Sequence, residues 1–381
     1  APARLVESVV GIGLLIGVAE VLGVVGLLYA WVLVAASLVI AGTMVLWRAG
    51  PVAAGDPPPL PVAEASSGVV PPTTPPAGPG AFALLITVGV IAVVFAHWGL
   101  TAKDALDRGI FNFDSLWYHM PFAAEMAHSH SVTGFHYTET VFTNWLYPQN
   151  SELLHAVGIL LTERDTLSLF INFGFLGLAF LAAWCIGRPY GRGHLTVAGA
   201  AVLLVGYTLV VREPGAAKND VVAAALLLAA VAILVNAWRD NARAPGWPLA
   251  AAGLAVGLPV GTKSTALAMA AALTVAVIVL TPAGRRWAAA AWWFLPALAG
   301  GGFWYLRNLI AAGNPLPQLE SIGPLSLPHP ERLQSGRPDF SIAHYATDTG
   351  VWREYFGPGL DQAFGALWPL VVAAAIAGGL V

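Results

Sequence analysis

The acidic residue best placed to do chemistry is Asp114, which lies in the sequence FNFDSLWYHMP at residues 111–121. A carboxylate among aromatic side chains at the end of an apolar segment is partly desolvated, and desolvation makes it a better base. Aspartate is also a common helix N-cap, and a helix that starts near Ser115 would use it in that way. The sequence alone leaves both roles open.

Three further residues could line the same cavity as Asp114. Tyr118 and His119 follow it within five positions, and Tyr147 begins a second polar sequence, YPQNSELL. Histidine is a frequent metal ligand, but a single histidine at an interface is more often a hydrogen-bonded packing residue. We therefore expect these three side chains to shape a binding cavity.

A second acid, Asp220, ends the loop sequence REPGAAKND and directly precedes an apolar run. The positive end of a helix dipole favours aspartate at such a position, which is a purely structural role. Alternatively, Asp220 converges with Asp114 on one cavity. If that cavity holds a metal ion, these two carboxylates are its candidate ligands, and they suit Mg²⁺ or Mn²⁺ better than zinc.

Two basic residues at the ends of apolar runs could bind an anion. Lys263 lies in GTKST between two short runs, and an ionisable residue at membrane depth is costly enough to be a functional candidate. Arg307 lies in WYLRN, and a guanidinium can hold a phosphate with paired donors. Each also has a structural alternative, since Lys263 could snorkel to the interface and Arg307 could anchor a helix end at the lipid headgroups.

The composition indicates what kind of molecule positions these residues. Hydrophobic residues make up 57% of the chain and charged residues only 10%, with a mean hydropathy of +0.71. Ordinary globular domains are about one quarter charged. The apolar residues come in solid runs without strand-like alternation, so the sequence predicts an all-α polytopic membrane protein. The net charge of −3 gives no indication of a nucleic-acid partner.

The apolar runs predict about ten spans. They fall near residues 5–22, 30–47, 81–99, 166–186, 195–211, 221–238, 247–260, 265–280, 287–306 and 364–381. The run at 247–260 is short and contains Pro248 and Pro259, so it could cross only part of the membrane.

Charge in the short loops predicts the orientation. Four short arginine-containing segments lie on one side of the predicted spans, and they contain Arg48, Arg188, Arg192, Arg239, Arg243, Arg285 and Arg286. By the positive-inside rule that side is the cytoplasm. The long polar segments 100–165 and 307–361 then face outside, and we expect an integral protein of the plasma (inner) membrane with an external active site.

The chain divides into three predicted parts. Residues 1–48 form a two-span extension, residues 49–80 a proline-rich cytoplasmic linker, and residues 81–381 a transmembrane module with the two external segments. A composition such as that of residues 49–80 cannot pack a core and favours extended backbone.

The order of the motifs resembles the GT-C superfamily of integral-membrane glycosyltransferases. An external segment with DSLWYHMP is followed by YPQN, by an Asn-Asp pair before a span, by GTK, and by WYLRN with GNP after it. The resemblance covers roughly residues 81–315 and is nearest to the protein-mannosyltransferase and aminoarabinose-transferase branches. Two features depart from the family: the two spans before Trp47 are additional, and a second acid beside the first-loop acid has no clear match.

This resemblance implies a sugar donor carried on polyprenyl phosphate and a glycan, lipid or protein acceptor that enters from outside. Asp114 matches the first-loop acid of the family, which acts as the base or binds a metal, and transfer would invert the sugar. A divalent cation, Mg²⁺ or Mn²⁺, is an optional cofactor. The residues expected to bind substrate or phosphate are Lys263, Arg307, Tyr118, His119, Tyr147 and Asp220.

A transporter or flippase of lipid-linked or anionic solutes is the alternative function. Broken spans with a buried lysine suit such proteins as well. The chain has no evident internal repeat, however, and its polar residues gather on one side rather than at the midplane. Both features favour the glycosyltransferase.

Overall fold

The computed structural model describes residues 2–49, 80–134, 143–239, 246–330, 342–370 and 372–373. Within these ranges the chain is mostly helical, and its sheet is a two-stranded antiparallel hairpin. The predicted all-α class is therefore confirmed. Most of the predicted linker at 49–80 lies outside the described residues, as does half of the predicted last span at 364–381, namely residues 371 and 374–381.

The helices follow the apolar runs of the sequence. The long helices are α1 (Pro2–Val24), α2 (Ala30–Ala49), α3 (Ala81–Arg108), α6 (Ser168–Gly187), α9 (Asp220–Arg239) and α12 (Arg286–Ala312). The shorter ones are α4 (Met120–Ser129), α5 (Asn150–Thr162), α7 (Gly193–Leu204), α8 (Tyr207–Arg212), α10 (Trp247–Val260), α11 (Ala266–Leu280), α13 (Ile342–Thr347), α14 (Thr349–Val351) and α15 (Gly357–Phe364). The described residues also form two π-helices, η1 (Ser115–His119) and η5 (Trp352–Phe356), and three 3₁₀ turns, η2 (Asn144–Leu146), η3 (Arg188–Tyr190) and η4 (Ala283–Arg285). The two strands are β1 (Ser321–Ile322) and β2 (Leu325–Ser326).

Four of the described helices, α1, α3, α6 and α9, are long and apolar enough to cross a membrane. The segments Ala266–Leu280 and Ala283–Ala312 would add a fifth span, although they are bent by 119° where they meet. The apolar segments Ala30–Thr43, Gly193–Leu204 and Trp247–Val260 are shorter than the roughly 20 residues that a bilayer requires. By length and composition the described residues thus support four to five spans, and the predicted ten are not confirmed.

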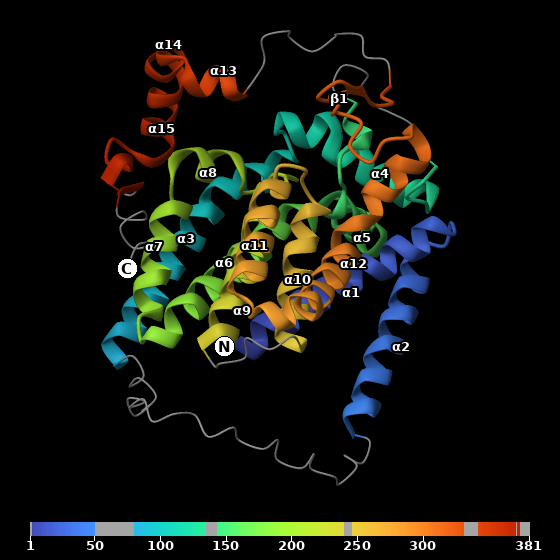
Figure 1. The fold of residues 1–381 in the computed structure, drawn as a ribbon, viewed down its shortest axis with the longest axis horizontal. Helices are drawn as coiled ribbons and strands as arrows, with labels where there is room; N and C mark the ends of the chain where they lie inside the picture. Colours follow the sequence, from blue (N-terminus) through green and yellow to red (C-terminus); the bar gives the residue numbers. More distant parts are fainter. Residues whose placement is uncertain are drawn as a thin grey trace.

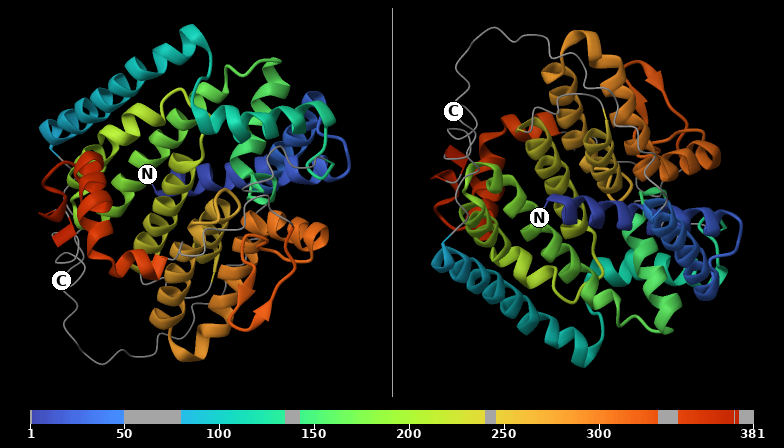
Figure 2. Two further views of the ribbon diagram at one scale, coloured as in Figure 1. Left: turned by 90° about the horizontal axis from the view of Figure 1, so that it is seen from above. Right: turned by 90° about the horizontal axis from the view of Figure 1, so that it is seen from below.

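The helices form one bundle whose polar connections gather at one end. α9 packs against α6 and α10, α10 packs against α12, and α1 contacts α5, α6, α9, α10 and α12 (Figure 2). Figure 1 shows α4, α8 and the β hairpin at the upper end, whereas α6 joins α7, and α11 joins α12, at the lower end. The predicted division between the N-terminal extension and the rest stays a prediction, but α1 is part of this bundle.

Glycine residues bring α10 and α12 into backbone contact. Gly253, Gly257 and Gly261 recur every four residues, so they share one face of α10 and its C-cap. A Cβ atom on Gly257 would lie 2.1 Å from the carbonyl oxygen of Ala297, and one on Gly301 would lie 2.2 Å from that of Gly257. Small residues at this spacing allow close helix packing in lipid. The contact fixes the C-terminal end of α10 against α12.

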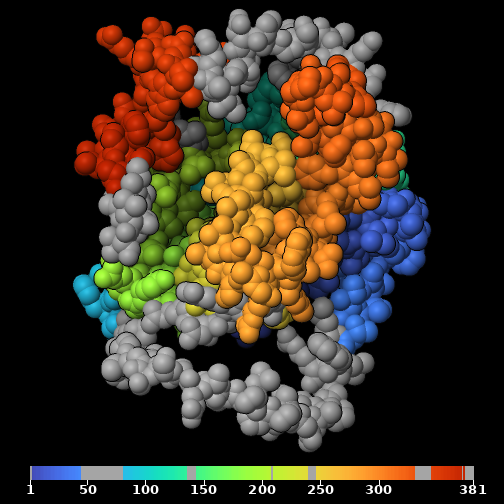
Figure 3. Space-filling view, viewed as in Figure 1, coloured from blue at the N-terminus to red at the C-terminus, as the bar shows by residue number. Residues whose placement is uncertain are grey.

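An apolar groove lies where α10, α11 and α12 meet. It encloses about 780 Å³, and its lining includes Val260, Tyr305 and Leu306. Figure 3 shows α11 and α12, in yellow and orange, on the viewed face, and the surface above α11 is hollowed between α12 and the red C-terminal helices. The groove thus reaches toward the end of the bundle where the polar segments lie.

We expect Gly257→Ala to destabilise the protein by about 1–3 kcal/mol, because its methyl group would overlap the backbone of α12. Thermal unfolding in detergent would show a lower midpoint. Gly89→Ala on α3 is the matched control, since nothing lies within 4 Å of its added Cβ atom and alanine is the better helix former. A Gly257→Ala midpoint equal to that of Gly89→Ala would show that the two backbones can separate at no cost.

Candidate functional site

The backbone around Asp114 is held by a neighbouring amide. The side-chain oxygen of Asn112 accepts hydrogen bonds from the backbone N–H groups of Asp114, at 3.1 Å, and Ser115, at 3.4 Å. The Asp114 side chain makes no capping hydrogen bond, so the alternative in which Asp114 caps this helix is wrong. Asn112 takes that structural role, and the Asp114 carboxylate is left to face the site.

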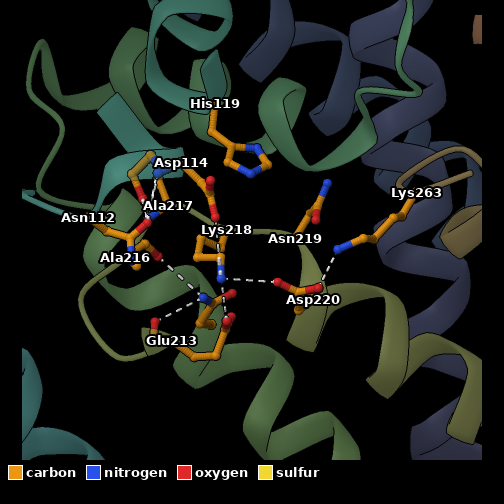
Figure 4. Close-up of polar contacts among 12 residues, drawn as sticks. Asn112, Asp114, His119, Glu213, Ala216, Ala217, Lys218, Asn219, Asp220 and Lys263 are labelled. Carbon is orange, nitrogen blue, oxygen red and sulfur yellow. Dashed lines mark hydrogen bonds and ion pairs between the residues drawn. The ribbon is translucent and has the colours of Figure 1, made fainter. Parts of the chain in front are cut away.

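Asp114 leads into the π-helix η1. The backbone N–H of Met120 donates to the carbonyl of Ser115, five residues earlier. In an α-helix, residues five apart are rotated by about 140° from each other, whereas i→i+5 bonding brings them near one face. Asp114 and His119 therefore lie on the same side of this segment, as Figure 4 shows.

The acids and bases of three segments meet in one charge network. Lys218 Nζ lies 3.0 Å from Glu213, 3.3 Å from Asp220 and 3.7 Å from Asp114. The other carboxylate oxygen of Asp220 pairs with Lys263 (Figure 4). The structure therefore brings together three residues that the sequence predicted to share a site: Asp114, Asp220 and Lys263.

Burial is uneven within this network. Glu213 and Lys218 are buried, whereas the side chains of Asp114 and Asp220 are 42% and 39% exposed. Burial raises the pKa of Glu213, although the charge of Lys218 opposes that shift. Burial lowers the pKa of Lys218, but the negative charges of Glu213 and Asp220 outweigh it and the net shift is upward. Lys218 is thus a fixed cation, and the two exposed carboxylates are the ones that a substrate can reach.

Hydrogen bonds between side chains and backbone groups join the three segments that carry these charges. The Ser115 hydroxyl accepts a bond from the N–H of Ala217 at 3.0 Å. The Asn219 side chain donates to the carbonyl of Thr262 at 3.2 Å. The loop 212–220 is therefore fixed to η1 on one side and to the Lys263 turn on the other.

Asn150 holds the Lys263 turn to the rest of the bundle. Its side-chain nitrogen donates to the carbonyls of Leu258, at 3.1 Å, and Gly300, at 3.0 Å, while its side-chain oxygen accepts from the indole of Trp304 at 2.7 Å. Its backbone N–H donates to the carbonyl of Gly261 at 2.9 Å. One fully buried amide thereby connects α5 with the C-terminal end of α10 and with the middle of α12.

The predicted cavity residues Tyr118, His119 and Tyr147 lie together beside the network. The Tyr118 ring is 4.0 Å from that of His119 and 6.1 Å from that of Tyr147, centre to centre. Burial raises the pKa of Tyr118, and the charges of Glu152 and Asp114 add to the shift. The Tyr118 hydroxyl is therefore neutral and can only donate or accept a hydrogen bond.

Behind these rings lies a buried acid that the sequence analysis did not select. Glu152 Oε1 lies 2.5 Å from His119 Nδ1, and both side chains are at most 2% exposed. His155 follows on the same face of α5 and is fully buried. Glu152 is the one charged residue of the motif YPQNSELL. Its charge in an otherwise neutral motif could have marked it as a candidate site residue.

Arg307, predicted to hold phosphate beside Lys263, packs against a different segment. Its Nη2 donates to the carbonyl of Trp145 at 2.5 Å and to the side-chain oxygen of Asn308 at 3.0 Å. Its guanidinium lies 4.8 Å from the ring centre of Trp304. These contacts fasten α12 to the segment before α5, and a phosphate-binding role for Arg307 stays a prediction.

The geometry offers little to a divalent cation. Lys218 stands between Asp114 and Asp220, where its positive charge would repel a metal ion. Among the described residues, no group of three or more histidine, cysteine or acidic side chains is arranged to hold one. We therefore derive no step that involves a metal.

Comparison with models of protein families, with curated proteins and with solved structures finds no match for this chain. The resemblance to the GT-C superfamily therefore rests on its motifs, and the functional argument rests on the site itself.

The buried His155 predicts a pH dependence of stability. Burial lowers its pKa from 6.5 to about 3, so the unfolded chain takes up a proton near pH 6.5 that the folded chain does not. Its contribution is present above pH 6.5 and is lost as the pH falls toward 3, by about 1.4 kcal/mol per pH unit. We expect the unfolding midpoint of His155→Gln to fall less than that of the wild type between about pH 7 and about pH 5.5.

The exposed residue His128 provides the control, and His128→Gln should follow the wild type across this range. If His155→Gln shows the same pH dependence as the wild type, His155 does not remain neutral in the folded protein.

Proposed function

We propose that the chain transfers a sugar from a polyprenyl-phosphate donor to a hydroxyl acceptor at the outer face of the membrane. The observation that carries the proposal is the pair of exposed carboxylates, Asp114 and Asp220, joined by Lys218 and Lys263 at one end of an apolar bundle. Such a transfer needs a base for the hydroxyl and a fixed cation for the departing phosphate.

The groove between α10, α11 and α12 supports a lipid-linked donor. It is lined almost entirely by apolar side chains and holds about 780 Å³. The Tyr305 hydroxyl, on its wall, donates to the carbonyl of Val260 at 2.9 Å, three residues before Lys263. A prenyl chain in the groove would therefore place its phosphate near the turn that carries Lys263.

The chemistry follows from these positions. Asp114 takes the proton of the acceptor hydroxyl, and the oxygen attacks the anomeric carbon from the side opposite the phosphate. The new carbon–oxygen bond forms as the bond to the phosphate oxygen breaks, and the phosphate leaves with the bonding electrons. Because phosphate is a good leaving group, Lys263 needs only to stabilise its charge, and the configuration at the sugar is inverted.

Asp220 holds Lys263 in place before the donor binds. The carboxylate contacts both Lys263 and Lys218, so it can keep its bond to Lys218 when a phosphate approaches Lys263. Lys218 in turn remains fixed by Glu213 at 3.0 Å. This arrangement positions the ammonium group of Lys263 in advance, which is how a site stabilises charge that develops only during reaction.

In this proposal the bundle lies in the plasma (inner) membrane, with its polar end outside. The shorter helices α2, α7 and α10 would complete the membrane-embedded set toward the predicted ten spans. The acceptor is a glycan, a lipid or a protein with a free hydroxyl group.

We expect Asp114→Asn to reduce sugar transfer by about 10²- to 10⁴-fold, because the amide cannot accept the proton. Proteoliposomes would be given a panel of polyprenyl-phosphate hexoses and pentoses with a cell-envelope extract, and released polyprenyl phosphate would be measured. Asp107→Asn is the control, since Asp107 is exposed on α3 and pairs with Lys103. Undiminished transfer by Asp114→Asn would remove Asp114 as the base.

The same proteoliposomes distinguish the glycosyltransferase from the alternative, a transporter or flippase. If the wild type moves the labelled lipid across the bilayer and transfers no sugar from any donor in the panel, the protein is a transporter rather than a transferase.

We expect Lys263→Gln to weaken the binding of polyprenyl phosphate by about 10- to 100-fold, since a hydrogen bond to a charged group contributes about 1.5–3 kcal/mol. Binding in lipid nanodiscs would be compared with that of polyprenol, which lacks the phosphate and should be unaffected. Lys103→Gln is the matched control, because Lys103 is also paired with an aspartate but lies exposed on α3. Equal phosphate binding by both variants would show that Lys263 does not hold the donor.

A further inference from the structure

The buried pair of Glu152 and His119 has the geometry of an acid–base group. The two side chains come from α5 and η1, 33 positions apart in the sequence, and their contact of 2.5 Å is fully shielded from solvent. An ionic carboxylate can only accept hydrogen bonds, so Nδ1 of His119 is the donor in this contact. In the neutral form of the ring, Nε2 is then the unprotonated nitrogen and can accept a proton.

The imidazole lies on the same side of η1 as Asp114. Because η1 is a π-helix, Asp114 and His119 lie near one face of it, although they are five residues apart. Figure 4 shows the His119 ring beside Asp114 and over the side of the network formed by Lys218 and Asn219. A proton on Asp114 and the unprotonated nitrogen of His119 therefore lie on the same side of η1.

The groups around the pair leave the negative charge of Glu152 available to His119. The second carboxylate oxygen of Glu152 has no hydrogen-bond partner among the described residues. The charged or titratable groups that act on the pair are Arg307 on α12, His155 on α5, and Tyr118 on η1, which also feels Asp114, Tyr147 and Asp220. His155 and Tyr118 are both neutral there, so Glu152 is the nearest negative charge to the ring.

We propose that His119, held by Glu152, receives the proton that Asp114 takes from the acceptor, and so returns Asp114 to its basic form. The inference rests on the proposed function and adds a second proton-transfer group to the same site. The proton passes from the Asp114 carboxyl group to Nε2, and the ring becomes an imidazolium that donates from Nδ1 to Glu152. Once the product has left, the proton returns to water by way of the exposed Asp114 carboxylate, which restores the neutral ring, so the cycle balances without a co-reactant.

The first test changes the charge of Glu152 and keeps its shape. Glu152→Gln should bind polyprenyl phosphate as the wild type does, and its transfer rate should fall about 10- to 100-fold. The acid limb of its pH–rate profile should move to lower pH, because the imidazolium loses its stabilising negative charge. Glu152→Asp, which keeps the charge, should restore part of the rate and return the acid limb toward its wild-type position.

Glu125→Gln is the control, since Glu125 is an exposed acid on the neighbouring helix α4. It should leave both the rate and the pH–rate profile unchanged. A wild-type profile in Glu152→Gln would overturn the proton-transfer role and reduce the pair to a packing contact.

The second measurement does not depend on activity. Nitrogen-15 NMR of histidine-labelled protein, with His119→Gln as the subtraction reference, isolates the signal of His119. The glutamine amide can still donate to Glu152, so this variant should keep the fold. The neutral ring should carry its proton on Nδ1, which donates to Glu152.

The two measurements separate the failure of this inference from that of the proposed function. A wild type that binds polyprenyl phosphate but transfers no sugar from any donor contradicts the function. A His119 signal from a neutral ring with its proton on Nε2 contradicts the pair whether or not transfer is found.

Discussion

A single buried amide, that of Asn150, holds the functional end of the bundle together. α10 ends inside the protein, where its last carbonyl groups have no further helical turn to bond with and no water to replace it. Asn150 satisfies the carbonyls of Leu258 and Gly300 from its side chain and that of Gly261 from its backbone. The Thr262 and Tyr305 hydroxyls donate to the carbonyls of Leu258 and Val260, so the end of α10 is a fixed turn from which Lys263 reaches Asp220.

The close packing of α10 on α12 makes that arrangement possible. Gly257 and Gly301 remove the side chains that would hold the helices apart, so Asn150 reaches both backbones at once. Trp304, bonded to the Asn150 oxygen, then aligns the turn of α12 that carries Arg307. The close approach of α10 and α12 therefore supports both the helix packing and the turn that carries Lys263.

Part of this site could be predicted from the sequence. Asp114, Asp220 and Lys263 were predicted to share a cavity because each follows or precedes an apolar run, and helix ends of one side must meet. The pairing of Glu152 with His119 could not be predicted, since it depends on how α5 folds back beneath η1. Asn112, rather than Asp114, caps the start of η1. This could not be predicted, because sequence spacing does not distinguish two neighbouring candidates for a cap. The described residues support four to five spans by length and composition, and the predicted ten are not confirmed, because several apolar runs form helices shorter than a bilayer requires.

The charges of the site are divided between buried and exposed groups. The carboxylates of Asp114, Glu213 and Asp220 outnumber the ammonium groups of Lys218 and Lys263. Glu213 is buried against Lys218, where burial raises its pKa and the charge of Lys218 opposes that shift. Glu213 therefore fixes Lys218 in position, and the more exposed pair of Asp220 and Lys263 is the part of the network that an arriving phosphate meets.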